Sequence, residues 1–249
     1  MSIPPEEALI RRDKYDGDPA ADLSEDLARL RAGEPLAYVI GWIPFLGLRV
    51  GLSSRPLIPR PETEWWTEEL IAHLKEKFGT KPFSFLDLCA GSGAIGLAVL
   101  AAFPQARVTL AELRPEHGAQ IRENLEVNVL DASRATIIES DLFAALSSMR
   151  FDVIATNPPY IPEDRALEAS VAAFEPQEAL FAGSDGLSLI RRIAADAPVH
   201  LTAPGELWME CDTSNTEEAA ALLRAQGATD AQIRTDPYGR PRIVVGYYA

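Results

Sequence analysis

The stretch FSFLDLCAGSGAIGLAVLAA, residues 83–102, decides the fold of this chain of 249 residues. It begins with a short apolar run typical of a buried strand, and Pro104 ends the longer apolar run that follows. Between the two runs, Gly91, Gly93 and Gly96 satisfy the pattern GxGxxG, in which a tight turn lets the next helix begin at a ligand. The stretch therefore predicts a strand, a glycine turn and a helix. The glycines alone are also compatible with a turn that only packs tightly.

Strand-like and helix-like segments alternate from this stretch to the C-terminus. The predicted strands are residues 83–89, 107–112, 135–142, 151–157 and 205–212, with a closing antiparallel pair at 228–235 and 240–248. The predicted helices follow Gly93, begin at Pro115, and cover residues 186–201 and 215–226. Such alternation predicts an α/β fold with βαβ crossovers and a mostly parallel sheet. In these sheets ligands bind outside the carboxyl ends of the strands.

The chain upstream of this region has a different character. Residues 1–34 are polar, and Leu23, Leu27 and Leu30 at helical spacing predict one short helix, with the first twenty residues poorly ordered. Residues 35–61 are rich in Pro and Gly and predict a linker with a β-hairpin. Residues 62–249 form the predicted catalytic domain, which opens with an amphipathic helix that ends at Gly79.

Composition restricts the class of protein. The net charge of −14 opposes binding to nucleic acid, whose phosphates need cations. Cys89 and Cys211 are the only cysteines and the three histidines are scattered, so we expect neither a disulfide framework nor a metal site. The start lacks a signal peptide, and the longest apolar run, residues 94–103, is shorter than the roughly 20 residues that span a bilayer. We expect a cytoplasmic protein without membrane contact.

Two carboxylates at predicted strand ends suit a nucleoside. Glu112 closes the second strand about twenty residues after the glycine turn, where a carboxylate can accept both ribose hydroxyls. Asp141 follows the third strand and can accept the exocyclic amino group of an adenine, although an Asp there is equally common as a turn residue or helix cap. An adenosine pocket formed by these residues and the glycine turn is our interpretation.

The fourth strand ends in the stretch VIATNPPYIPE, residues 153–163. Proline fixes φ and lacks an N–H, so this loop presents acceptors on a stiff backbone. The side-chain oxygen of Asn157 and the carbonyl of Pro158 can accept both N–H groups of a planar nitrogen, while Tyr160 packs against the planar group. Beside an adenosine pocket, these groups predict N-methylation of an amide or amino group by S-adenosylmethionine, because they stabilise charge that develops on the nitrogen.

Several longer motifs resemble one family, the HemK-type (PrmC) protein-glutamine N5-methyltransferases. The motifs are LDLCAGSGAIGLA, ESDLF, NPPYIP, FEPQEALFAGSDGL at 174–187, and PLAYVIGWIPFLGLRV with PLIPRPETE across 35–64. The resemblance runs from about residue 27 to the C-terminus and includes DPYGRPR. It implies a Rossmann-like class I S-adenosylmethionine-dependent methyltransferase with a seven-stranded sheet containing one antiparallel strand. It also implies the glutamine of the GGQ motif in peptide-chain release factors as the acceptor.

The resemblance also assigns roles to individual residues. Carried over, the cofactor-binding residues are Cys89, Ala90, Gly91, Ser92, Gly93, Glu112, Asp141, Leu142 and Asn157. The residues that hold the acceptor glutamine are Asn157, Pro158, Pro159 and Tyr160, with Asn157, Pro158 and Tyr160 as the catalytic group. Two features depart from the family: the N-terminal helical segment is short, and Leu142 stands where an aromatic is common, which removes a stacking surface for adenine.

Other readings remain open at this point. One is glutamine methylation of a ribosomal protein, and another is an amino-directed DNA or RNA methyltransferase, which the charge of −14 disfavours. An NAD-linked oxidoreductase would need a hydride-site acid or base, and a passive adenosine-binding module would not need two aimed acceptors. We expect a monomer whose partner is a release factor. Arg60 faces the substrate entrance or pairs with an acid, and the 161–185 loop is expected to close over the acceptor.

Overall fold

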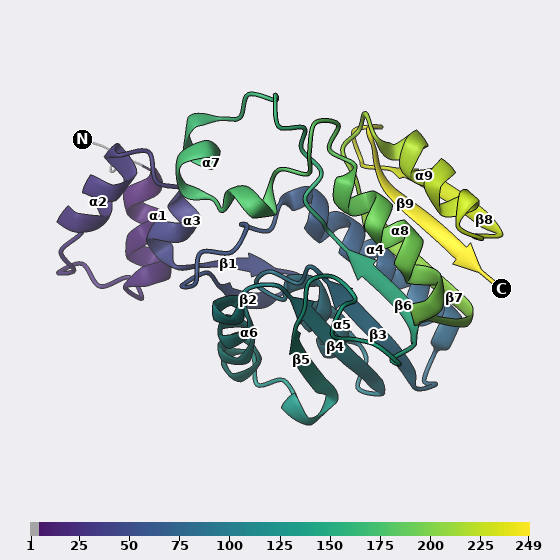
Figure 1. Cartoon of the computed structure of the whole chain (residues 1–249). Helices are drawn as coiled ribbons and strands as arrows, with labels where there is room; N and C mark the ends of the chain where they lie inside the picture. The colour runs from purple at the N-terminus through teal and green to yellow at the C-terminus, as the bar shows by residue number, and fades with distance from the viewer. Residues whose placement is uncertain (1–4) are drawn as a thin grey trace.

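The computed structural model describes residues 5–249 of the chain. Three short helices and a hairpin from the N-terminal part lie beside a larger body in which helices cover a twisted sheet (Figure 1). No helix among residues 5–249 is long and apolar enough to cross a membrane.

The N-terminal segment contains two helices before residue 34, not one. Helix α1 (Pro5–Lys14) precedes α2 (Ser24–Arg31), which is the helix predicted from the leucine spacing. The expected disorder is wrong for residues 5–20, because α1 buries Ile10 completely against Leu23 of the following loop and Val39 of α3 (Leu36–Ile40). Residues 1–4 lie outside the described part. Its apolar residues, Ala8 to Ile10, are consecutive and show no helical spacing, so periodicity did not predict this helix.

The predicted hairpin is confirmed. Strands β1 (Trp42–Phe45) and β2 (Leu48–Gly51) pair antiparallel, with Phe45 opposite Leu48. Both turn residues have positive φ, 46° at Leu46 and 80° at Gly47, the combination that a type I′ hairpin turn requires. The Leu46 amide donates to the carboxylate of Glu64 at 2.7 Å, which ties the turn to the helix that follows.

Seven strands form the main sheet. They are β3 (Phe83–Leu88), β4 (Ala106–Glu112), β5 (Ala135–Glu139), β6 (Phe151–Thr156), β7 (Leu201–Glu210), β8 (Asp230–Thr235) and β9 (Pro241–Tyr248). Their order is β5-β4-β3-β6-β7-β9-β8, and β9 is antiparallel to both of its neighbours while the other pairs are parallel. The predicted Rossmann-like sheet with one antiparallel strand is therefore confirmed.

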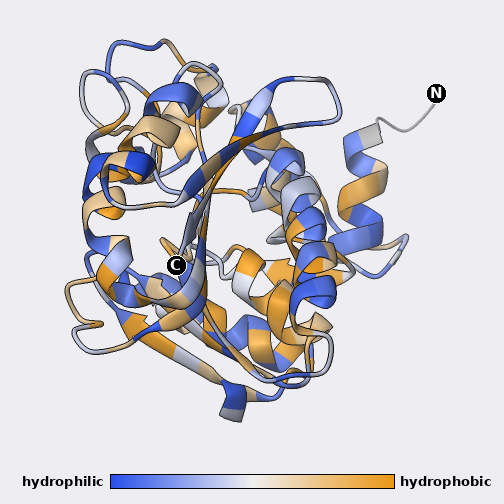
Figure 2. Cartoon of the chain, turned by 90° about the vertical axis from the view of Figure 1, so that its right-hand side faces the viewer, coloured by the Kyte–Doolittle hydropathy of each residue, from blue (hydrophilic) through white to orange (hydrophobic). Residues whose placement is uncertain are grey.

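Helices cover both faces of this sheet. They are α4 (Pro61–Phe78), α5 (Ala94–Ala102), α6 (Pro115–Val127), α8 (Ser188–His200) and α9 (Thr216–Ala225). The connection after β6 contains a helix that the sequence did not indicate, α7 (Ala169–Phe174), and short 3₁₀ turns lie at η1 (Ala132–Arg134) and η2 (Gln177–Ala179). Orange and blue alternate along the covering helices in Figure 2, as expected of segments with one buried and one exposed face.

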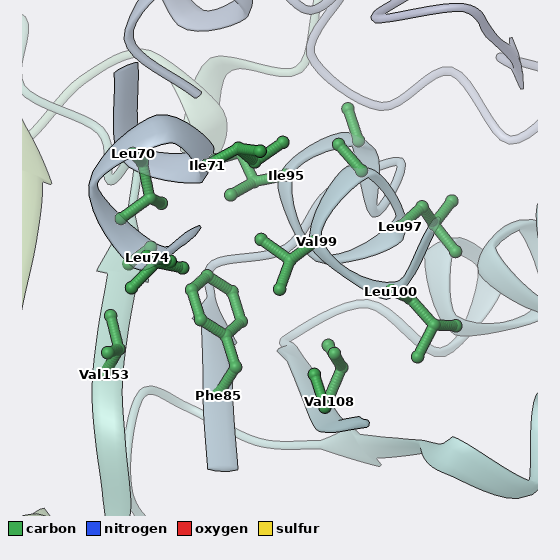
Figure 3. Packing of buried hydrophobic residues seen from close by; sticks show 14 of the residues in the cluster. Leu70, Ile71, Leu74, Phe85, Ile95, Leu97, Val99, Leu100, Val108 and Val153 are labelled. Carbon is green, nitrogen blue, oxygen red and sulfur yellow. The ribbon is translucent and has the colours of Figure 1, made fainter. Parts of the chain in front are cut away.

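Strand alternation divides the core into two layers. Phe85 of β3 points into the layer under α4 and α5, while its neighbours Leu86 and Leu88 pack toward α8 and α9. Figure 3 shows the first layer, where Leu70 and Leu74 of α4 meet the strand and the apolar side of α5. Because α5 is packed tightly here, its first turn is held firmly at the end of β3.

One buried carboxylate in the sheet gives the fold a pH-dependent stability. Glu206 of β7 accepts hydrogen bonds from His73 at 2.9 Å, Lys77 at 2.7 Å and Trp208 at 3.0 Å. Burial by itself would raise the pKa of Glu206, but these donors outweigh it and lower the pKa to about 2. Because the folded pKa lies below the unfolded one, this stabilisation is complete above the unfolded pKa and is lost as pH falls toward 2.

We therefore expect Glu206→Gln to lower the free energy of unfolding by about 2 kcal/mol at pH 7, and by much less at pH 3. Urea unfolding of both proteins at several pH values measures this difference. The matched control is Glu76→Gln on the exposed side of α4, which should leave the free energy of unfolding unchanged. A Glu206→Gln deficit of equal size at pH 3 and pH 7 would contradict the expectation.

Candidate functional site

A cavity of about 410 Å³ opens at the carboxyl ends of the central strands, and we call it the strand-end cavity. The chain order turns back between β3 and β6, which is the place where open α/β sheets bind ligands. Its wall contains six of the nine residues predicted to bind the cofactor: Cys89, Gly91, Glu112, Asp141, Leu142 and Asn157. Segments that are distant in the sequence therefore meet around one volume, as the strand-end argument predicted.

The other predicted residues of the glycine turn lie behind this wall. Ala90, Ser92 and Gly93 are buried and do not line the cavity. Gly93 has φ of 81°, and a Cβ there would come within 3.0 Å of Ile121, so this glycine lets α5 begin directly against α6. From this position the three residues maintain the shape of the turn and do not contact the cavity directly.

Glu112 is held in a fixed pose at the end of β4. Its two carboxylate oxygens accept hydrogen bonds from the backbone amides of Gly91, at 2.8 Å, and Arg114, at 3.0 Å. Glu112 is 8% exposed, and it lines the strand-end cavity. A carboxylate has about four acceptor positions, so two remain for a pair of hydroxyl donors in the cavity. This arrangement fits a ribose.

Two residues of the cavity wall have unusual backbone conformations. Cys89 has φ of 61° and Leu142 has φ of 50°, a region that residues other than glycine rarely adopt. Such conformations cost free energy and gather at ligand sites. Burial raises the pKa of the Cys89 thiol to about 12, so this side chain is neutral. Beside Leu142, Asp141 is more than half exposed and pairs with Arg192 at 2.9 Å.

Several residues of the strand-end cavity were not foreseen from the sequence. They come from the start of α6, from the 161–185 segment and from α8: Arg114, His117, Glu178 and Arg192. Arg114 and Glu178 form an ion pair across the cavity mouth. Burial lowers the pKa of His117, whose ring nitrogen lies 2.9 Å from the Ser54 hydroxyl. The sequence did not indicate them, because a charged residue on a surface segment has the same pattern whether or not it lies beside a cavity.

The glycine turn also depends on a buried acid to which the sequence motifs assigned no role. Asp87 of β3 accepts a hydrogen bond from the Gly96 amide at 2.8 Å, and a Cβ at Gly96 would lie 3.0 Å from that same oxygen. Burial raises the pKa of Asp87 to about 8. The third glycine of GxGxxG is therefore required because α5 packs directly on this carboxyl group.

A second cavity, of about 440 Å³, lies beside the first along the Asn-Pro-Pro-Tyr loop, and we call it the prolyl cavity. Asn157, Pro158 and Tyr160 line it, whereas Pro159 lines the strand-end cavity. Asn157 belongs to both walls, together with Leu57 and Ala179. One amide side chain thus stands where the two cavities adjoin.

The two predicted acceptors are available. The Asn157 side-chain nitrogen donates to the Thr63 hydroxyl at 3.2 Å. Within residues 5–249, neither the Asn157 side-chain oxygen nor the Pro158 carbonyl accepts a hydrogen bond from another protein group. Two unpaired acceptors on a ring-stiffened loop can receive the two hydrogens of a planar NH₂ group.

A buried carboxylate at the end of β7 supports this loop, and its role was not predicted from the sequence. Glu210 is 1% exposed and accepts hydrogen bonds from the Tyr160 hydroxyl at 3.0 Å, from Trp66 at 2.7 Å and from Thr63 at 2.8 Å. Burial raises the pKa of Glu210, and burial together with this acid raises the pKa of Tyr160 well above its usual value. Its position as an acidic residue at the end of an apolar strand could have identified it.

The expected ion pair of Arg60 is confirmed, and its place at a substrate entrance stays a prediction. Arg60 lines the prolyl cavity, and its guanidinium pairs with Glu175 at 2.7 Å. Glu175 is buried and also accepts the Ile58 amide at 3.1 Å, so it joins the 161–185 segment to the chain before α4. The segment itself contributes to the walls of both cavities through residues that include Ala179. Whether it moves during a reaction stays a prediction.

The chemistry open to this arrangement is the presentation of a planar nitrogen to an electrophile. Acceptors in the prolyl cavity would fix the nitrogen, and the strand-end cavity has the carboxylate and backbone of a nucleoside site. Among the described residues, no group of three or more His, Cys, Asp or Glu side chains is placed to hold a metal ion.

Comparison with known proteins agrees with this geometry. The model of the family described as "Methyltransferase small domain" matches residues 65–175. The chain is 38% identical to the "Release factor glutamine methyltransferase" of Deinococcus radiodurans over 228 residues, which cover 91% of this chain and 79% of that protein. It is also 38% identical to the protein of the same name from Bordetella pertussis, over 88% of this chain and 80% of the relative.

A solved structure with the same fold is the T. thermophilus 16S rRNA N2 G1207 methyltransferase in complex with AdoMet and guanosine. It superposes with a TM-score of 0.60 at 20% identity, over 84% of this chain and 50% of that one. At that level of identity the likeness establishes the arrangement of strands and helices.

Proposed function

This chain belongs to the release factor glutamine methyltransferase family, and from that premise we propose that it methylates the side-chain nitrogen of a glutamine in a peptide-chain release factor. The acceptor is the glutamine of the GGQ motif, as the sequence resemblance implies. The observation that carries the proposal is the position of Asn157 in the walls of both cavities. A ribosomal-protein glutamine or a nucleic-acid amino group is a weaker alternative, since the related proteins are named for the release factor.

The strand-end cavity is the proposed site of S-adenosylmethionine, which supplies a methyl group on a sulfonium whose leaving group is neutral. Glu112 would accept the ribose hydroxyls, and the turn at Cys89–Gly93 would wrap the methionine part. Asp141 and Leu142 would flank the adenine. The free acceptor positions of Glu112 and the positive φ of Cys89 and Leu142 support this fit.

The prolyl cavity is the proposed site of the glutamine amide. The Asn157 side-chain oxygen and the Pro158 carbonyl would each accept one N–H, which points the nitrogen toward the strand-end cavity. As the nitrogen forms its new bond to carbon, these acceptors stabilise the positive charge that develops on it, and the lost proton passes to water. Tyr160 would cover the planar group, and Pro159 would separate it from the cofactor.

The proposal extends to partner and location. A release factor acts where translation takes place, so we propose that the protein works in the cytoplasm as a monomer. The net charge of −14 supports a protein acceptor over a nucleic acid. The division into residues 1–34, 35–61 and 62–249 is kept as a proposal.

Incubation with S-adenosylmethionine and a panel of acceptors, followed by mass spectrometry, tests the function. The panel contains the release factor, a ribosomal protein and an oligonucleotide. We expect one added methyl group on the GGQ peptide alone, and exclusive methylation of either other acceptor would contradict the assignment. Calorimetry with S-adenosylhomocysteine and NADH tests the cofactor, and binding of NADH alone would overturn it.

A further inference from the structure

We propose that Thr63 and Glu210 are positioning residues, which fix the Asn157 side-chain amide with its oxygen toward the acceptor nitrogen. The proposal rests on the proposed function and adds two residues from elements outside the Asn-Pro-Pro-Tyr loop. Thr63 lies in the first turn of α4 and Glu210 is the last residue of β7. Packing brings Thr63 to Asn157, which follows β6, and brings Glu210 to Thr63.

The direction of the hydrogen bonds determines the amide orientation. The Thr63 hydroxyl donates to Glu210 at 2.8 Å, and a hydroxyl has a single hydrogen to donate. Toward Asn157, at 3.2 Å, Thr63 can therefore act only as an acceptor. Asn157 must turn its NH₂ group to Thr63, and its oxygen consequently faces away from Thr63. The two ends of an amide group, oxygen and NH₂, have nearly the same shape. The hydrogen bonds from Asn157 to Thr63 and from Thr63 to Glu210, which we call the relay, distinguish its two orientations.

Glu210 keeps the relay from reversing. The Trp66 indole can only donate, and together with Thr63 and Tyr160 it surrounds the carboxylate with three donors. Burial raises the pKa of Glu210, while these three donors and the positive charge of Arg242 in the prolyl cavity wall oppose that rise. With Glu210 accepting from every side, the Thr63 hydrogen stays on Glu210 and does not point to Asn157.

A wrong amide orientation would be costly for the reaction. An NH₂ group of Asn157 facing the NH₂ group of the glutamine would set donor against donor and leave one buried N–H unpaired. Without the hydrogen bond to Thr63, the Asn157 amide would rotate between its two orientations. Each binding event would then have to fix it in the correct one. In the IPRPETE stretch at 58–64, Arg60, Thr63 and Glu64 each bind another segment: Glu175, Asn157 and the hairpin turn.

The test compares threonine variants at saturating S-adenosylmethionine. Thr63→Val keeps the shape of the side chain but removes the hydroxyl, and we expect kcat for release-factor methylation to fall by roughly 10- to 100-fold. Thr63→Ser restores the hydroxyl and should restore most of kcat. Affinity for S-adenosylhomocysteine should change by less than about twofold in either variant, since Thr63 does not line the strand-end cavity.

The matched control is Thr67→Val, one turn later on α4. Thr67 is fully buried and its hydroxyl donates to the Thr63 carbonyl at 2.7 Å, so the substitution has the same chemistry without touching Asn157. In an Asn157→Ala background, Thr63→Val should have no further effect on kcat. An equal loss of kcat in Thr67→Val, or full activity in Thr63→Val, would overturn the relay.

A second readout requires no acceptor and separates the relay from the proposed function. In isotope-labelled protein, the Asn157 side-chain hydrogen that is bonded to Thr63 should be protected from exchange in the unmodified chain and in Thr63→Ser, and exposed to exchange in Thr63→Val. Unchanged protection in Thr63→Val would disprove the relay. If the relay is observed but the protein methylates no release factor, the proposed function fails and the amide orientation stands.

Discussion

Asn157→Ala is expected to lower kcat for methylation of the release factor by about 10²- to 10³-fold, the loss typical of removing one preorganised group from a transition-state site. The alanine side chain has no oxygen to accept the glutamine N–H, so the nitrogen loses one of the two proposed hydrogen bonds that orient it. The Pro158 carbonyl alone leaves rotation about the remaining hydrogen bond. The positive charge that develops on nitrogen is then stabilised by one acceptor and by water.

Kinetics at saturating S-adenosylmethionine measure this effect, because Asn157 also lines the strand-end cavity. We expect affinity for S-adenosylhomocysteine, measured by calorimetry, to fall by less than about tenfold, so the larger loss belongs to the chemical step. Asn128→Ala is a control amide: its side chain bonds to Arg49 and Asn124 at the end of α6 and lines neither cavity. Methylation by Asn157→Ala at more than about a tenth of the original kcat would remove the proposed mechanism.

Gly186→Ala is expected to lower the free energy of unfolding by about 3 kcal/mol and to reduce methylation as well. Gly186 has φ of 73°, and a Cβ there would lie 2.3 Å from the Tyr160 carbonyl oxygen and 3.1 Å from the Pro162 ring. These are backbone and ring atoms that cannot rotate away, so the chain after Asn157 must move. A displacement of about 1 Å in a positioning segment can cost about 100-fold in rate.

Gly227→Ala separates the two sources of this loss. Gly227 has φ of 94°, and no atom lies within 4 Å of the position that a Cβ would occupy there, so the substitution has the backbone penalty alone. Urea unfolding should show a deficit of about 1–2 kcal/mol for Gly227→Ala with normal kcat. If both variants lost the same free energy of unfolding and had the same kcat, the Tyr160 carbonyl would accommodate the extra carbon without strain.

Much of the fold follows from local patterns in the sequence. The glycine turn between a buried strand and an apolar helix is specified within residues 83–102, and the hairpin at 42–51 follows from alternation and a turn with Gly47. Both patterns reflect neighbours in the chain, where periodicity directly states which face is buried. Helix α1 escaped prediction because its stability depends on Ile10 meeting Val39, a contact that no local window contains.

The sequence also predicted where several residues of the candidate site lie. Residue types and strand-end positions predicted Glu112, Asp141 and Asn157 at one edge of a sheet, because parallel strands end on the same side. Only the tertiary structure decided how Asn157 is oriented, since Thr63 reaches it from α4 and Glu210 of β7 fixes the hydroxyl of Thr63. A residue's place on a strand is a local property, whereas the direction of a hydrogen bond depends on every donor and acceptor that packing brings within reach.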